Sequence, residues 1–174
     1  MFDTDSKLTE IPCKFPNLKN ARQMFMDCKI SGHLDLDMPS YFPNVKTNSF
    51  GGGDYPTAYM FGNCPITSIS FDVSTCDNCI SMFNSCTQLT TCTKAVFMNG
   101  GNYQSMFSES SFDEASADII IAAARAANVS MLHIGVNSAC RNDNFKTKHG
   151  CEQLSEGYDD QWKLTGTNII IKWN

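Results

Sequence analysis

The chain has 174 residues, of which 42% are hydrophobic, 11% are aromatic and only 18% are charged, and its formal net charge is −5. This length suits one domain or a short array of repeats, and the composition is too apolar and too aromatic for a disordered chain. The negative charge argues against a phosphate-binding surface, so we expect no nucleic-acid partner, and no apolar run approaches the ~20 residues that span a bilayer.

The N-terminal residues 1–5 contain no basic region followed by an apolar stretch, so we expect no secretory signal. The default compartment is then a reducing one, in which cysteines remain thiols. The chain has nine cysteines, an odd number that leaves at least one unpaired in a monomer. We therefore ask whether these cysteines follow a repeat or cluster as ligands.

Short apolar or alternating runs predict strands in the first half of the chain. They lie at residues 8–11, 34–36, 66–71 and 89–92. Between them we expect turns and short helical segments. Three consecutive glycines at 51–53 mark a loop inserted after a partial repeat at 42–46.

Within residues 24–107 a Met-Phe pair recurs four times. The pairs begin at Met24, Met60, Met82 and Met106, so the intervals are 36, 22 and 24 residues. Three positions after the Phe stands a small residue, in order Cys28, Cys64, Cys86 and Ser110. Spacings of this size are typical of stacked repeats, in which each unit buries its apolar side only against its neighbours. We expect Met and Phe to point inward and to stack on the same pair one unit away.

Residues 113–174 do not repeat. An acidic start and an alanine-rich middle predict a helix over 115–128, and residues 131–136 read as a strand. Residues 137–144 are polar and turn-like, residues 152–162 predict a second helix, and residues 169–173 predict a final strand. The order helix, strand, helix, strand suits a cap that continues a parallel sheet and closes its open end.

Residues 71–90 (FDVSTCDNCISMFNSCTQLT) closely resemble the unit of the BspA-like leucine-rich repeat family. That unit runs Phe-Asp-Thr-Ser, a short variable segment, Met-Phe, two residues, Cys, two residues and Leu. The match also extends over residues 8–30 and 54–71 and weakly over 95–112; the glycine-rich insertion and Ser110 depart from the pattern. The pattern of 113–174 is similar to the ends of repeat proteins found in phages of gut bacteria.

Together, repeat and resemblance predict an α/β fold, a short leucine-rich-repeat solenoid with a parallel sheet and a C-terminal α/β cap. Irregular BspA-like repeats would occupy residues 1–112 and the capping region residues 113–174, in a single continuous domain.

No local motif indicates catalysis, a metal or a cofactor. The pair Cys76 and Cys79 is a Cys-x-x-Cys, but a zinc site needs a second pair and a redox site needs a thioredoxin-like context, so we interpret both as structural thiols. Asp35 and Asp37 lack the ligand count of a calcium loop, and we interpret them as a solvated face.

Four tyrosines are the candidate binding residues. Tyr41, Tyr55, Tyr59 and Tyr103 lie in or near loops rich in Gly, Asn, Pro and Ser. Tyrosine offers a large apolar face and a polar tip, which suits recognition of a protein or a sugar. The alternative is that Tyr59 and Tyr103, each close before a Met-Phe pair, face the core. Tyr55 is the strongest surface candidate.

We expect a non-catalytic binding or structural protein, since repeat arrays offer a broad surface rather than a pocket. The resemblance implies a phage virion component, such as a tail-fibre, head-fibre or capsid-decorating module for host attachment or assembly, made in the host cytoplasm. Its partners would be a protein or surface glycan and other virion proteins. The alternatives are a fragment of a bacterial cell-surface adhesin and, from another class, an enzyme with a cysteine nucleophile.

Overall fold

A computed structural model describes residues 2, 4–5, 7–45, 55–154 and 160–174. Its elements, in chain order, are β1 (Gly32–Asp37), α1 (Met38–Tyr41), β2 (Ile66–Asp72), β3 (Thr91–Val96), β4 (Asn102–Phe112), α2 (Glu114–Ala126), β5 (Met131–Val136), the 3-10 helix η2 (Ser138–Cys140), α3 (Asp143–His149), β6 (Cys151–Gln153), β7 (Gln161–Leu164) and β8 (Ile169–Trp173).

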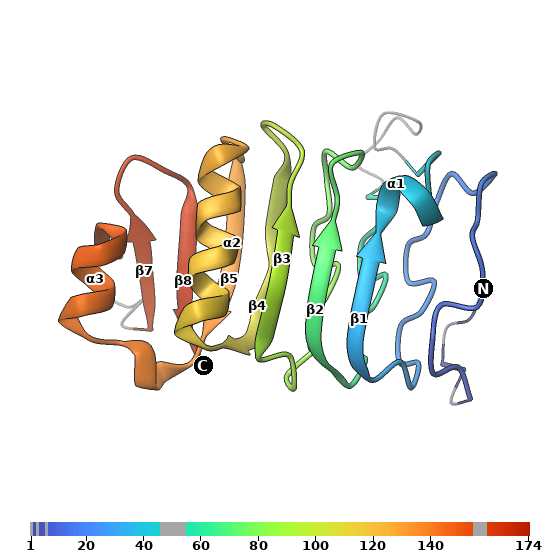
Figure 1. Cartoon of the computed structure of the whole chain (residues 1–174), viewed down its shortest axis with the longest axis horizontal. Helices are drawn as coiled ribbons and strands as arrows, with labels where there is room; N and C mark the ends of the chain where they lie inside the picture. The colour runs from blue at the N-terminus through green and yellow to red at the C-terminus, as the bar shows by residue number, and fades with distance from the viewer. Residues whose placement is uncertain (1, 3, 6, 46–54, 155–159) are drawn as a thin grey trace.

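These strands form two sheets. β1, β2 and β3 make a three-stranded sheet in that order, and both pairs are parallel. The second sheet has the spatial order β4-β5-β8-β7-β6; its β4–β5 and β5–β8 pairs are parallel, and its β8–β7 and β7–β6 pairs are antiparallel. The elements follow one another along the long axis of the molecule, from β1 near the N-terminus to β7 and α3 at the other end (Figure 1). The predicted α/β class with a parallel sheet is therefore confirmed.

Helix α2 lies beside β3 (Figure 1). The Asp113 carboxylate caps its first turn by accepting a hydrogen bond from the Ser116 backbone N–H at 2.8 Å. The Ser116 hydroxyl oxygen in turn accepts from the Cys92 backbone N–H at 2.8 Å. The helix buries Ala117, Ile120, Ile121 and Ala124, which share one face. Because α2 stands next to β3, it covers the edge that this strand would otherwise expose.

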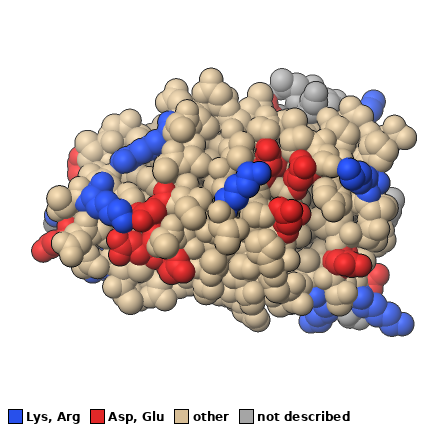
Figure 2. All heavy atoms as spheres, in the orientation of Figure 1, with Lys and Arg blue, Asp and Glu red and all other residues tan. Residues whose placement is uncertain are grey.

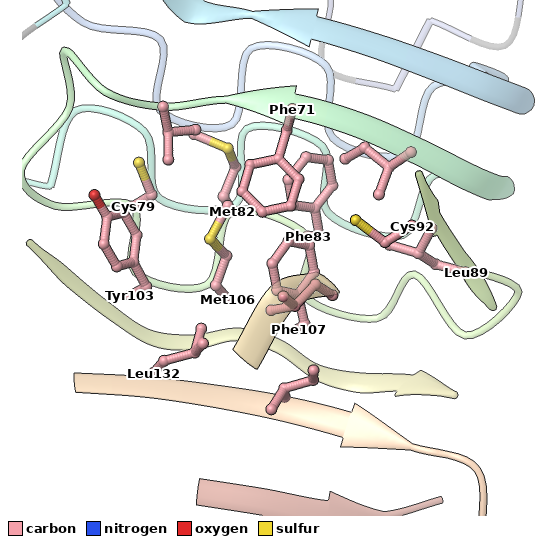
Figure 3. Packing of buried hydrophobic residues seen from close by; sticks show 14 of the residues in the cluster. Phe71, Cys79, Met82, Phe83, Leu89, Cys92, Tyr103, Met106, Phe107 and Leu132 are labelled. Carbon is pink, nitrogen blue, oxygen red and sulfur yellow. The ribbon is translucent and has the colours of Figure 1, made fainter. Parts of the chain in front are cut away.

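The phenyl rings of the Met-Phe segments form a continuous column. Stacked pairs join Phe2, Phe25, Phe61, Phe83 and Phe107, with centroid distances of 5.7, 5.3, 5.4 and 5.2 Å and interplanar angles of 6°, 17°, 8° and 8°. The methionines of all four repeats are buried as well. Figure 3 shows two successive Met-Phe pairs lying side by side in the core. The expected stacking of one pair on the next is confirmed, and each ring pair contributes ~0.5–1.5 kcal/mol beyond its buried area.

Backbone geometry explains how the rings come into register. In the first three units the residue before the Met and the residue two after the Phe have a left-handed φ, between 53° and 61°: Gln23 and Asp27, Tyr59 and Asn63, Ser81 and Ser85. The Phe N–H of each unit donates to the Met carbonyl of the next, at 2.9 Å from Phe25, 2.9 Å from Phe61 and 3.2 Å from Phe83. These segments are turns, whereas the fourth pair, Met106-Phe107, belongs to β4.

The recurring cysteine has a hydrogen-bonding role. The Cys64 thiol donates to the Phe25 carbonyl at 3.0 Å, and the Cys86 thiol donates to the Phe61 carbonyl at 3.0 Å. The Cys28 thiol likewise donates to the Phe2 carbonyl at 2.9 Å. The fourth copy differs, because the hydroxyl of Ser110 is buried without a hydrogen-bond partner among the described residues.

A further copy of the Met-Phe turn, which the repeat pattern did not predict, lies at the N-terminus around Phe2. The Phe2 N–H donates to the Met24 carbonyl at 3.0 Å, and the Thr4 N–H donates to the Met26 carbonyl at 2.8 Å. Thr4 has a φ of 61°, which matches the equivalent residues of the later units. Asp5 stands where those units carry cysteine, so the motif is incomplete at this copy.

Several predicted elements are wrong or displaced. Residues 8–11 form no strand, and the strand predicted at 89–92 begins at Thr91 as β3. The helix predicted over 152–162 is also wrong, because β6 occupies Cys151–Gln153 and β7 begins at Gln161, while residues 155–159 lie outside the described part. Trp162 and Leu164 are buried and alternate with polar neighbours, which is the period of a strand. Helix α3 falls on a region that we expected to be turn-like at its start.

Asn174 links β4 and β5 through hydrogen bonds. The Asn174 side-chain amide donates to the Ser108 carbonyl at 2.8 Å and to the Ser110 carbonyl at 2.6 Å, where the β4–β5 register is irregular. Gly135 of β5 lies against the same atoms, and a Cβ at this position would collide with the Ser110 carbonyl oxygen and the Asn174 amide. Close approach of these segments therefore requires glycine at position 135.

Among the described residues, no helix combines the length and the apolar character needed to cross a membrane.

Candidate binding surface

The outward side of the three-stranded sheet carries three rows of mainly polar side chains. Leu34 and Leu36 of β1 and Ile69 and Phe71 of β2 are buried, so the alternate residues point away from the core. The strand register aligns these outward residues as His33–Ser68–Thr91, Asp35–Ser70–Lys94 and Asp37–Asp72–Val96. We call these nine residues the sheet face.

Hydrogen bonds link the first two rows of the sheet face. His33 Nδ1 lies 2.8 Å from the Ser68 hydroxyl, and His33 Nε2 lies 3.5 Å from the Ser70 hydroxyl. The Ser70 hydroxyl donates to the Asp35 carboxylate. These contacts hold side chains of β1 and β2 in place, so the entropic cost of ordering these side chains is already met in the folded chain.

This arrangement differs from a serine hydrolase triad. In such a triad the imidazole lies between the serine and the carboxylate and takes the hydroxyl proton. Here the Ser70 hydroxyl donates directly to Asp35, and the closest contact of His33 is to Ser68. The imidazole of His33 therefore does not bridge a serine and a carboxylate in this arrangement.

Charge on the sheet face is concentrated in its second and third rows. Asp35, Asp37, Asp72 and Lys94 line a shallow hollow of about 110 Å³. Acidic side chains gather beside a basic one on this side of the molecule (Figure 2). No group of three or more metal-binding side chains converges among the described residues. Asp35 is exposed and Asp37 is half-buried, which agrees with the interpretation of both as part of a solvated face.

The four predicted tyrosines do not form one surface. Tyr55 and Tyr59 are 38% and 37% exposed, and Tyr41 is half-buried. Tyr103 has no exposed surface: its hydroxyl donates to the Cys76 carbonyl at 3.0 Å and accepts from the Met98 N–H at 2.9 Å. The surface prediction is therefore wrong for Tyr103, whose ring fills the core beside Cys79 (Figure 3).

Tyr41 and Tyr59 have separate settings. Lys14 Nζ lies 6.0 Å from the centre of the Tyr41 ring. Tyr59 lies at a left-handed position of its turn, outside the phenyl column. Exposure thus separates the two alternatives weighed for Tyr59 and Tyr103: the first lies at the surface and the second in the core.

All nine cysteines lie within the described residues and are thiols. Burial raises the pKa of Cys86 to about 12 and the pKa of Cys92 and of Cys151 to about 11. It also raises the pKa of Cys64, Cys79 and Cys140. A nucleophilic cysteine needs the opposite shift, since the thiolate is the reactive form.

Cys76 and Cys79 are both buried, and the Cys76 thiol donates to the Val45 carbonyl at 3.2 Å. This agrees with the interpretation of the Cys-x-x-Cys as a pair of structural thiols. The sheet face, in contrast, had no sequence motif of its own. Its signal was the alternation of polar and apolar residues in the predicted strands at 34–36 and 66–71.

Comparison of the chain with protein-family models, with curated proteins and with solved structures finds no match.

Proposed function

We propose that the chain is a non-catalytic binding and structural protein that uses its sheet face to contact a protein or a surface glycan. In this proposal the molecule is a short leucine-rich-repeat solenoid of the BspA-like kind with a C-terminal α/β cap. One observation carries the proposal. The residues that recur in every unit point inward, where the phenyl rings stack and the thiols bond to carbonyls.

Because the recurrent residues form the core, the outward residues of β1, β2 and β3 do not contribute to it. They form a mainly polar surface whose side chains are partly held by hydrogen bonds, which suits contact with a large partner through area and shape. The charge of this surface is mainly negative, which disfavours contact with the phosphates of a nucleic acid.

Within this proposal the protein is a phage virion component that serves host attachment or assembly and contacts other virion proteins. This part rests on the resemblance of residues 71–90 and of the C-terminal region. Mass spectrometry of purified particles tests it, and absence of the chain from the particles would rule it out. The alternative, a fragment of a bacterial surface adhesin, predicts a longer parent gene with a signal peptide and an anchor.

The sheet face itself is tested by substitution. Asp35→Asn combined with Asp72→Asn removes two charges without changing side-chain size. We expect at least a 10-fold weaker binding to particles or host cells with an unchanged melting temperature. Lys172→Gln, on the other sheet, is the matched control and should bind like the parent. Equal binding by all three proteins would exclude the sheet face as the contact surface.

The reactivity of the thiols distinguishes our proposal from the remaining alternative, an enzyme with a cysteine nucleophile. Cys13 is the exposed cysteine, so we expect it to react first with iodoacetamide at neutral pH. Rapid alkylation of a buried cysteine ahead of Cys13 would support the enzyme and would contradict our proposal.

A further inference from the structure

A second candidate site lies at the other end of the molecule from β1, independent of the sheet face. An open cleft of about 690 Å³ separates the C-terminal end of α2 from the turn that joins β7 and β8. Figure 1 shows these two segments reaching the same side of the molecule. The volume lies within the ~300–1,000 Å³ typical of small-molecule sites.

The cleft has an apolar base and a polar rim. Val129, Leu164 and Ile169 are the buried apolar residues that line it, and Val129, at 8%, has the largest exposed fraction of the three. The rim presents hydroxyl and amide groups from the segment that follows α2 and from the β7–β8 turn: Asn128, Thr165, Thr167 and Asn168. A ligand that fits must therefore have one apolar side and several hydroxyl groups.

The rim is held in place before any ligand arrives. The Asn168 side-chain amide donates to the Ser130 carbonyl at 3.0 Å. The Thr165 hydroxyl donates to the Glu152 carboxylate at 2.7 Å, and its backbone N–H donates to the Gly150 carbonyl at 2.8 Å. These bonds join the hairpin to β5 and β6, so binding requires little further ordering.

Arg125 supplies a cation at the junction of α2, α3 and the cleft. Its Nη2 donates to the His149 carbonyl at 2.6 Å, which fixes the guanidinium in position. A guanidinium has five N–H donors in a planar fork, so further donors remain for a carboxylate. Lys163 and Glu152 also line the cleft, so its three charged side chains sum to one positive charge, which a single carboxylate on the ligand balances.

No aromatic side chain is found among the described residues that line the cleft. Stacking on a ring is the usual means of holding a nucleobase, so a nucleotide is a poor fit. A sugar ring has an apolar C–H face and a rim of hydroxyls. We propose that this cleft binds a sugar carrying a single carboxylate, with the carboxylate at Arg125 and the hydroxyls at Asn128, Thr165 and Asn168.

Two probes that differ only at one carbon test the proposal on the intact chain. They are methyl β-D-glucuronide and methyl β-D-glucoside, with acetate as the control for a carboxylate alone. Titration is followed by amide chemical shifts in ¹H–¹⁵N spectra. We expect shifts at Gly166, Thr167 and Asn168, at least 10-fold tighter binding of the glucuronide than of the glucoside, and no saturation by acetate. Equal affinity for both sugars, or shifts confined to β1–β3, would overturn the proposal.

Two variants assign the binding groups. Asn128→Gly removes the amide at a residue whose φ is 46°, a conformation that glycine adopts readily, so the fold is preserved. We expect this variant to bind both sugars at least 5-fold more weakly. Arg125→Gln should lower the affinity for the glucuronide to that for the glucoside. Lys19→Gln, at an exposed residue that lines neither the cleft nor the sheet face, is the control and should change neither affinity. A folded Asn128→Gly protein that binds both sugars like the parent would refute the site.

Discussion

Replacing Gly135 with alanine tests how closely β5 approaches β4 and the C-terminus. The new Cβ would overlap the Ser110 carbonyl oxygen and the Asn174 side-chain nitrogen, and would lie 3.0 Å from the Phe107 carbonyl oxygen. Two of these three atoms are backbone atoms of β4, so rotation of a side chain cannot relieve the overlap. Overpacking of this kind costs ~1–3 kcal/mol, and displacement of the Asn174 amide from Ser110 adds ~1 kcal/mol. We expect a total loss of about 3 kcal/mol.

The assay is urea denaturation followed by circular dichroism, with Gly150→Ala as the matched control. Gly150 has a φ of 62°, and no described atom lies within 4 Å of the point where an alanine methyl group would stand. Alanine at position 150 should lower the free energy of unfolding only by the cost of placing an L residue in the left-handed conformation, ~1 kcal/mol. In an Asn174→Ala background, Gly135→Ala should cost about 1 kcal/mol less, because one of the overlapping atoms is gone. A loss at Gly135 no larger than the loss at Gly150 would refute the close approach of β4 and β5.

Three further predictions concern the core and the pH dependence of stability. Ser110→Ala removes a buried hydroxyl that has no partner among the described residues, so urea denaturation should show a gain of about 1 kcal/mol; a loss of stability would show that the hydroxyl is hydrogen-bonded. Cys86→Ala leaves the Phe61 carbonyl without its thiol donor and opens a small cavity, so it should cost ~1–2 kcal/mol, whereas Cys86→Ser should recover part of the loss; equal losses would exclude the donor role. Burial lowers the pKa of His133 below its usual 6.5, so the unfolded chain binds the proton more readily and stability should fall as the pH drops from 7 towards 5; His133→Gln should flatten that fall, and an unchanged pH profile in this variant would contradict the assignment.

The repeated part of the fold was predictable because its signal is periodic. Met24, Met60 and Met82 recur with a Phe and a small residue at fixed offsets, and stacking on a neighbour is what buries all three. Phe2 was missed because Asp5 replaces the cysteine, although the backbone bonds of the unit are retained. Backbone hydrogen bonds do not depend on side-chain identity. A degenerate copy of the repeat can therefore be identified from the structure when its sequence no longer shows the motif.

The C-terminal region was harder to predict because its pairing is non-local. Residues 152–162 have apolar residues at a spacing that also suits a helix, and pairing of β7 with β8 decides in favour of strands. Burial of Tyr103 was one of two alternatives that sequence alone leaves open. Its hydroxyl finds partners at Cys76 and Met98, and only the folded chain brings these together.

The spacing of the phenyl column has a consequence for how this molecule can vary. Phe25 and Phe61 are separated by 36 residues and Phe61 and Phe83 by only 22, yet their ring centroids are 5.3 and 5.4 Å apart. The distance between stacked rings therefore does not depend on the number of residues that connect them. Connecting segments of different length can therefore join the units while the phenyl column stays as it is.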